Sequence, residues 1–202
     1  DFFEQAKTIL PDLTKKDTLF VVIRTYEEAW TTLGQLRLSL GKALNLINTA
    51  DHTLFWVTDF PMFEYDTQTR RWQAKHHQFT APQVGWEGKE LKDIKARAYD
   101  LVGNGEELGG GSIRIHSSDV QNKIFELLGM SKEKAEQKFK FLFEAQDFGY
   151  PPEGGIAFGI DRLVMLFGGT ENMRDVIAFP KTNQGSCLMM GSPSSVEPEQ
   201  LQ

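Results

Sequence analysis

The sequence has one cysteine, Cys187, and no long uninterrupted apolar run. A single cysteine excludes an internal disulfide, and a reducing compartment is its simplest setting. A membrane-spanning helix needs roughly 18 to 20 apolar residues in succession, which no stretch supplies. The N-terminus has neither the pattern of a signal peptide nor that of a transit peptide. These absences favour a cytoplasmic protein without a membrane partner.

Positive charge is also scarce. The 22 Lys and Arg residues face 28 Asp and Glu residues, for a net charge of −6, so no global basic character indicates nucleic-acid binding. A protein with this net charge can still carry a local basic face. Of the 202 residues, 40% are hydrophobic, and 15 Phe and 4 Trp argue against disorder. The chain does not begin with Met, so we expect a processed product or a piece of a longer protein.

Alternating and β-branched runs predict several strands. Along the chain these strands cluster before most of the predicted helices rather than alternating with them. The predicted strands are Leu19–Arg24, Leu54–Thr58, Trp72–His77, Ala98–Val102, Glu107–His116 and Ile156–Ile160. The predicted helices are Glu27–Leu44, Asp119–Leu128 with a capping box of Ser118 and Gln121, a helix from the cap Ser131 to Ala145, and Asp161–Phe167 stopped by Gly168 and Gly169. This order favours an α+β fold with an antiparallel sheet flanked by helices.

The polar stretch Ile47–Thr53 is the predicted junction between two parts of the chain. Residues 1–48 would then form part of a small α/β domain that begins abruptly. Residues 49–202 would form the main domain, ending in a polar tail after Gly191.

Glycine is concentrated in the segment GNGEELGGGSIRIH, residues 103–116. Leu108 stands where a dinucleotide-binding fingerprint needs its third glycine, and no Gly-Lys-Ser/Thr follows to make a P-loop. Glu107 and Arg114 are seven positions apart, so regular alternation places them on opposite faces of a strand. A shared site would require a bulge or twist in the glycine run. A flexible hairpin edge with solvated charges stays open as the alternative.

Two further clusters carry candidate chemistry. His76 and His77 are adjacent on a predicted strand and point to opposite sides, so they are poor ligands for one metal ion. One of them could face a substrate, or both could be ordinary surface or packed residues. Arg162 opens a helix after GGIAFGID, and its guanidinium could stack on a base and neutralise phosphate. A capping and surface pair of Asp161 and Arg162 is the alternative.

Four segments, in their order and wording, carry a resemblance to a known family. They are DFPMFE (Asp59–Glu64), HHQFTAP (His76–Pro82), AYDLVGNGEELGGGSIRIH (Ala98–His116) and GGIAFGIDRLVMLFGGTENMRDVIAFPKT (Gly154–Thr182). Together they resemble the class II aminoacyl-tRNA synthetases, and specifically the aspartyl enzymes of bacterial type. The last segment is similar to motif 3 of that class. LGQLRLSLGKAL (Leu33–Leu44) resembles the closing helix of the domain that bacterial aspartyl enzymes insert into the catalytic domain.

The resemblance implies that L-aspartate is activated with ATP and Mg²⁺ and transferred to the 3′ end of a tRNA. Arg162 matches the arginine that stacks on adenine and faces the triphosphate. Glu107 matches the acidic residue that binds ATP through Mg²⁺, and Asp100 matches its acidic companion. Gly159, Ile160 and Asp161, with Arg162, match the ATP-binding end of motif 3.

On the amino-acid side, Arg114 matches the arginine that grips the side-chain carboxylate of aspartate. His76 matches the histidine over the bound amino acid, with His77 beside it. The resemblance also implies a cytoplasmic homodimer acting on the aspartate tRNA, with the asparagine tRNA as a further candidate. A related enzyme for Asn or Lys, and a non-catalytic paralogue that binds nucleotide or RNA, are the alternatives.

Two departures from the family pattern matter. Gln78 stands where many bacterial relatives have Pro, so the loop after the histidines is expected to sit differently. The sequence also shows no motif 1, no motif 2 and no anticodon-binding barrel. Motif 2 supplies the arginine on the α-phosphate, so we expect this chain alone to be unable to form the adenylate.

Overall fold

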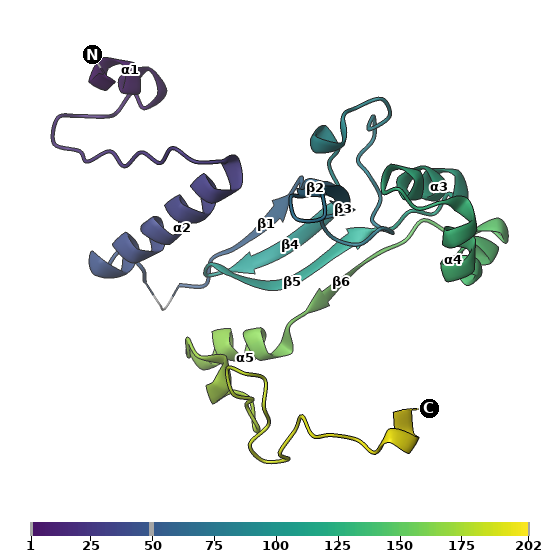
Figure 1. Ribbon diagram of the computed structural model, residues 1–202. Coiled ribbons are helices and arrows are strands. Elements are labelled where there is room, and N and C mark those ends of the chain that lie inside the picture. Colours follow the sequence, from purple (N-terminus) through teal and green to yellow (C-terminus); the bar gives the residue numbers. More distant parts are fainter. Residues whose placement is uncertain (1, 49–50, 202) are drawn as a thin grey trace. The chain divides into compact units, whose positions relative to one another are not determined.

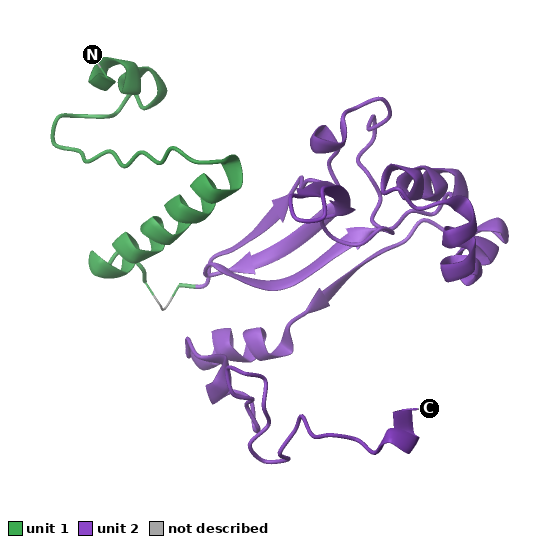
Figure 2. Cartoon of the chain, viewed as in Figure 1, with its two compact units in different colours: residues 1–51 green, residues 52–202 purple. Residues whose placement is uncertain are grey.

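The computed structural model describes residues 2–48 and 51–201 (Figure 1). Its described part divides into two compact units at Asp51 and His52 (Figure 2). Residues 49 and 50 of the predicted junction lie outside the described residues. No described helix has both the length and the hydrophobicity that a membrane crossing needs. The assignment of residues 1–48 and 49–202 to particular domains stays a prediction.

The first unit contains two helices, α1 (Phe2–Ile9) and α2 (Tyr26–Ala43). α2 confirms the predicted helix to within one residue at each end. It begins after Thr25, whose N–H donates to the carboxylate of Glu28 at 3.4 Å in the arrangement of a capping box. α1 was not predicted.

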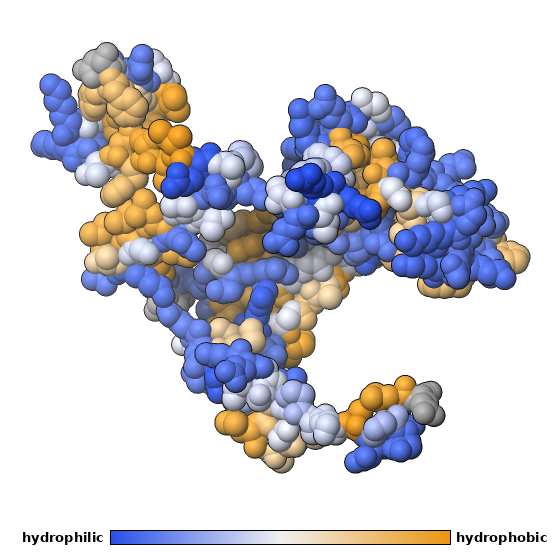
Figure 3. All heavy atoms as spheres, in the orientation of Figure 1, coloured by the Kyte–Doolittle hydropathy of each residue, from blue (hydrophilic) through white to orange (hydrophobic). Residues whose placement is uncertain are grey.

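The predicted strand Leu19–Arg24 is wrong. These residues form no strand, and among the described residues of the first unit there is no second strand with which they could pair. A strand needs such a partner because its N–H and C=O groups bond across the ladder rather than within the segment. Their side chains are correspondingly open to solvent, with Phe20 50% and Ile23 85% exposed, and hydrophobic surface is visible over this unit in Figure 3.

The second unit is built on a four-stranded antiparallel sheet in the order β1–β4–β5–β6. Its strands are β1 (Leu54–Thr58), β4 (Ala98–Gly103), β5 (Glu106–Ile113) and β6 (Gly154–Phe158). A separate hairpin, β2 (Phe63–Asp66) with β3 (Arg71–Ala74), precedes β4 in the chain. Every strand of the larger sheet overlaps a predicted one, and the antiparallel α+β fold is confirmed.

The predicted strand Trp72–His77 is too long. β3 ends at Ala74, and Lys75 makes one more backbone bond, from its N–H to the carbonyl of Met62 at 3.0 Å. β2 offers no further partner beyond that point, so the chain leaves the hairpin. His76 and His77 therefore lie in a loop after the strand rather than on it.

Three α-helices complete the second unit: α3 (Ser118–Leu127), α4 (Lys132–Asp147) and α5 (Ile160–Gly168). Short 3₁₀ turns occur at η1 (Leu91–Asp93), η2 (Met173–Asp175) and η3 (Pro198–Leu201). Ser131 caps α4 by accepting from the N–H of Lys134 at 3.4 Å, as predicted. Gly169, in the left-handed region with φ 66°, ends α5, also as predicted.

The predicted capping box of Ser118 and Gln121 is wrong. Ser117 is the N-cap, because it has the extended backbone that this position requires, and its hydroxyl accepts from the N–H of Val120 at 3.5 Å. Ser118 is already the first residue of the helix. The side chain of Gln121 is fully buried and bonds elsewhere.

The core lies at one end of the sheet, where α3 and α4 are seen together in Figure 1. Its residues come from the segment between β1 and β4, from the start of β4, from Ile115 and from α3. Its buried members are Met62, Phe63, Trp86, Ile94, Ala96, Ala98, Ile115 and Ile124. This packing holds the start of β4 and the residue after Arg114 against α3.

Candidate active site

A bulge in β5 decides which side chains share a face of the sheet. Leu101 of β4 pairs with Gly109, and the next residue, Val102, pairs with Glu107, so Leu108 is left without a partner on β4. Directly paired residues of antiparallel strands point to the same face. The extra residue therefore moves Glu107 to the face that Arg114 also occupies. The bulge that a shared site requires is confirmed.

Two carboxylates lie together on this face. Asp100 of β4 pairs with Gly110, and a Cβ built on Gly110 would collide with Oδ1 of Asp100 and lie 3.4 Å from Oε1 of Glu107. Burial raises the pKa of the Asp100 carboxyl above its ordinary value of 3.8, and the charge of Glu107 raises it further. The glycine at position 110 therefore provides the space in which two like charges meet.

The start of α5 is tied to the same part of β5. The N–H of Gly159 donates to the carbonyl of the bulged Leu108 at 2.8 Å. The guanidinium of Arg162 donates to the carbonyl of Glu107 at 2.6 Å and lies 3.6 Å from its carboxylate. Both side chains are partly exposed, so this ion pair adds little stability. The contact places Arg162, the cation predicted to bind ATP, next to Glu107 of the acidic pair.

Arg114 and His77 form a second group. The Arg114 guanidinium contacts the His77 ring and donates to the hydroxyl of Ser112 at 2.6 Å. Burial lowers the pKa of His77, and the charges of Arg114 and His76 lower it further. A neutral imidazole can accept a hydrogen bond from a guanidinium, whereas an imidazolium cannot. This arrangement places a fixed positive charge on the same face of the sheet as the acidic pair.

The remaining predicted residues stand at the margins of these two groups. The ring of His76 meets Phe60 edge to face at 5.1 Å, and its charge acts on the carboxyl of Asp100. Ile160 is 68% exposed, and Asp161 lies in the first turn of α5, where negative charge suits the positive end of a helix. In the part of the chain that the structure describes, neither Ile160 nor Asp161 makes a side-chain hydrogen bond or ion pair with the groups above.

Two residues of this network were not predicted. Ser112, 3% exposed, accepts from Arg114 and also from the hydroxyl of Thr80 at 3.4 Å, and Thr80 is 1% exposed. Ser112 stands two positions before Arg114 and therefore shares its face, a signal that strand alternation alone contains. Thr80 could not be found in this way, because its contact with Ser112 is made across 32 positions of sequence.

The acidic pair suits a magnesium ion that is shared with phosphate. Within residues 2–48 and 51–201 there is no group of three or more His, Cys, Asp and Glu side chains that could hold a metal by itself. Mg²⁺ prefers hard oxygen ligands and is commonly held by one or two carboxylates together with substrate phosphates. Asp100 and Glu107 fit that pattern, since they supply two carboxylates around the open space at Gly110.

We expect Asp100→Asn to stabilise the protein at pH 7. The pKa of Asp100 is raised in the folded state, so folding favours its neutral form, and stability falls as the pH rises from 3.8 through the raised pKa. The neutral amide removes this penalty, with a gain on the order of 0.5 kcal/mol because the group is only partly buried. Thermal unfolding at pH 7 and at pH 3.5 measures it. A gain of equal size at both values would contradict the electrostatic cause.

The sequence matches the family described as tRNA synthetases class II (D, K and N) over residues 3–183. The chain therefore belongs to this family. It is 48% identical, over 98% of its length, to an aspartate–tRNA(Asp/Asn) ligase of Thermoanaerobacter sp. (strain X514). It is 53% identical, over 94% of its length, to an aspartate–tRNA ligase of Bacillus licheniformis. These matches cover 34% and 33% of the two relatives, so the chain spans about a third of their length.

Solved structures support the fold. An aspartyl-tRNA synthetase of Entamoeba histolytica is similar over 90% of this chain and 31% of its own, with a TM-score of 0.50 and 20% identity. The asparaginyl-tRNA synthetase of the same organism also gives a TM-score of 0.50, at 19% identity, over 90% of this chain and 34% of its own. Because both enzymes match equally well, the fold does not distinguish an aspartyl from an asparaginyl enzyme.

Proposed function

We propose that this chain is part of an aspartate–tRNA ligase. The enzyme joins L-aspartate to ATP as aspartyl-adenylate, releases pyrophosphate, and transfers the aspartyl group to the 3′ end of a tRNA. The observation that carries the proposal is the placement of Arg114, beside a neutral His77, on the same sheet face as Asp100 and Glu107. Sequence identity of about 50% to two aspartate–tRNA ligases supports the choice of amino acid.

Arg114 would bind the side-chain carboxylate of aspartate. A guanidinium can present two N–H groups to the two oxygens of a carboxylate, so it distinguishes aspartate from asparagine by charge and by geometry. The bonds to Ser112 and His77 fix its orientation before the substrate arrives. His76 and His77 would stand over the bound amino acid.

The other group would bind ATP. Adenylation brings two anions together, so the site has to supply cations and oriented donors rather than a protein nucleophile. Arg162 would stack on adenine and face the triphosphate, next to Gly159, Ile160 and Asp161 at the start of α5. Asp100 and Glu107 would hold Mg²⁺ together with the phosphates, which neutralises the charge that the phosphates carry.

The wider context of this part of the enzyme is also proposed. Residues 1–48 would be the end of the domain inserted in bacterial aspartyl enzymes, and residues 49–202 the last part of the catalytic domain. The enzyme would be a cytoplasmic homodimer. The relatives carry two names, aspartate–tRNA ligase and aspartate–tRNA(Asp/Asn) ligase, and only the second names the tRNAs. We propose the aspartate tRNA as the substrate of this enzyme, with the asparagine tRNA as the candidate second one.

Amino-acid-dependent exchange of pyrophosphate into ATP tests the proposal. The full-length protein is assayed with Asp, Asn and Lys offered separately, and we expect exchange with Asp alone. The 202-residue chain by itself is expected to give no exchange above a mock-purified control, because it lacks the motif 2 arginine. Exchange with Asn or Lys in place of Asp would assign a related synthetase. A folded protein that binds ATP without any exchange would be a non-catalytic relative.

A further inference from the structure

A buried glutamine on α3 supports the loop that carries His76 and His77. Gln121 is 0% exposed, and its side-chain amide donates to the main-chain carbonyl of Gln78 at 2.8 Å. The acceptor is the carbonyl of the residue that directly follows His77 in the chain. This bond therefore connects the interior of α3 to the backbone that holds the imidazole against Arg114.

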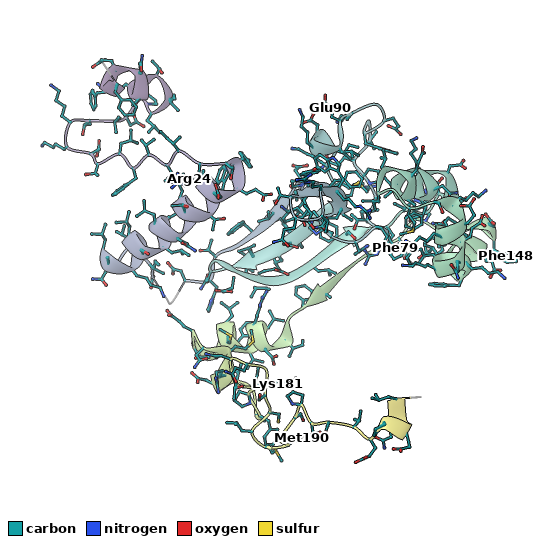
Figure 4. All side chains as sticks on the ribbon, viewed as in Figure 1. Arg24, Phe79, Glu90, Phe148, Lys181 and Met190 are labelled. Carbon is teal, nitrogen blue, oxygen red and sulfur yellow. The ribbon has the colours of Figure 1, made fainter. Side chains whose placement is uncertain are left out.

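The same loop is held at two other points. The N–H of Ile115 donates to the carbonyl of Phe79 at 2.9 Å, which ties the loop to the end of β5. The ring of Phe79 packs edge to face on Phe125 of α3 at 6.4 Å and on Phe139 of α4 at 5.2 Å. Figure 4 shows Phe79 between the sheet and this helix pair. Both points are at Phe79, the residue after Gln78, and Gln121 fixes the carbonyl of Gln78 itself.

The other polar atom of Gln121 indicates why a glutamine is used. Its Oε1 is buried and has no hydrogen-bond partner among the described residues. Leaving a buried acceptor unpaired costs free energy, and an apolar side chain of the same shape would avoid that cost. A position selected for stability alone would favour such a side chain. The amide donor to Gln78 is the one feature of Gln121 that an apolar residue cannot supply.

We propose that Gln121 is a positioning residue for aspartate recognition, acting through the carbonyl of Gln78 on His77 and, through His77, on Arg114. The inference rests on the proposed function, because it concerns the amino-acid end of that site. The ATP end is anchored independently, by Gly159 on Leu108 and by Arg162 on Glu107. Loss of the Gln121 donor should therefore weaken the binding of aspartate and spare the binding of ATP.

The test compares Gln121→Met with the wild-type full-length protein in pyrophosphate exchange. Methionine keeps the length and volume of the side chain and removes the donor. We expect the KM for aspartate to rise about tenfold and the KM for ATP to stay within about twofold, since a small misplacement of positioning groups has effects of this order. If Gln121→Met does not fold, Gln121→Asn carries the same test, because its amide is one methylene too short to reach Gln78.

Gln146 on α4 provides a matched control. It is also a buried glutamine, 7% exposed, whose amide points at a main-chain carbonyl, that of Ile115 at 3.4 Å, and whose Oε1 is unpaired among the described residues. Gln146→Met should leave the KM for ATP within about twofold of wild type. It should raise the KM for aspartate less than Gln121→Met does, because its bond is long and reaches the residue after Arg114 rather than the histidine loop. Equal effects of the two variants on both substrates would show a general loss of packing and overturn the proposal.

A second readout does not depend on activity. The pKa of His77 is lowered by burial and by Arg114, so a loop released from α3 should return it toward 6.5. NMR titration of histidine-labelled protein, with His77→Gln to assign the signal, should show this rise in Gln121→Met and not in Gln146→Met. An unchanged titration of His77 together with an unchanged KM for aspartate would overturn the inference. Lack of exchange with aspartate in the wild type would instead refute the proposed function, and the titration would still decide the role of Gln121.

Discussion

Replacing Arg114 by alanine is expected to lower kcat/KM for aspartate about 100-fold or more, while the KM for ATP changes by less than about threefold. Removing one partner of a hydrogen-bonded charge pair costs roughly 2–5 kcal/mol. The substrate carboxylate would lose the guanidinium that binds both of its oxygens. Ser112 and His77 would lose the donor they now contact. Steady-state exchange with varied aspartate and with varied ATP measures the two effects separately.

Arg97→Ala is the matched control, since Arg97 is an exposed arginine one residue before β4. It should leave both KM values unchanged. Arg114→Lys should recover only a small part of the loss, because an ammonium cannot present two parallel N–H groups. An Arg114→Ala variant that keeps the wild-type KM for aspartate would show that the amino acid binds elsewhere.

Replacing Gly111 by alanine is expected to destabilise the second unit by about 3 kcal/mol, the upper range for overpacking. A Cβ at this position would overlap the carbonyl oxygen of Gly155 and lie 2.8 Å from its carbonyl carbon and 2.9 Å from Cα of Ile156. All three atoms belong to the backbone of β6, which cannot rotate away as a side chain would. The pairing of β5 with β6 would have to open, and with it the position of α5 and Arg162.

Thermal unfolding measures this loss, and about 3 kcal/mol corresponds to a fall in Tm of roughly 6–12 °C for a unit of this size. Gly155→Ala on the partner strand is the control, because a Cβ there meets nothing within 4 Å. It should change the Tm by no more than about 2 °C. Equal shifts for the two variants would indicate that loss of glycine in a strand, and not the steric overlap, is responsible.

Local features of the sequence were sufficient for several elements. The spacing of Trp30, Leu33 and Leu40 predicted α2, and Gly169 ended α5 where a left-handed cap was expected. β1 was predicted at its observed bounds, Leu54–Thr58. These features depend on neighbours within one or two turns of the chain, so the sequence contains all the information they need.

Elements that depend on distant partners were predicted less well. Leu19–Arg24 has the composition of a strand and forms none among the described residues, because pairing is a property of two segments. The predicted strand through His77 was too long for the same reason. Ala74 already pairs with Phe63, the first residue of β2, so β2 has no residue left to pair with those after Ala74. Ser117, rather than Ser118, caps α3 because of its backbone conformation, which composition does not specify.

The sequence alone determined the family, the candidate residues and the condition that Glu107 and Arg114 can share a site only across a bulge. The tertiary structure decided where that bulge lies, at Leu108, and which partners hold each group: Gly159 on the bulge, Ser112 and Thr80 near Arg114, and Gln121 beneath the histidine loop. The physical reason is distance along the chain. Hydrogen bonds between residues 32 and 43 positions apart, such as those of Thr80 and Gln121, leave no periodic signal in the sequence, because only the folded backbone brings the two atoms together.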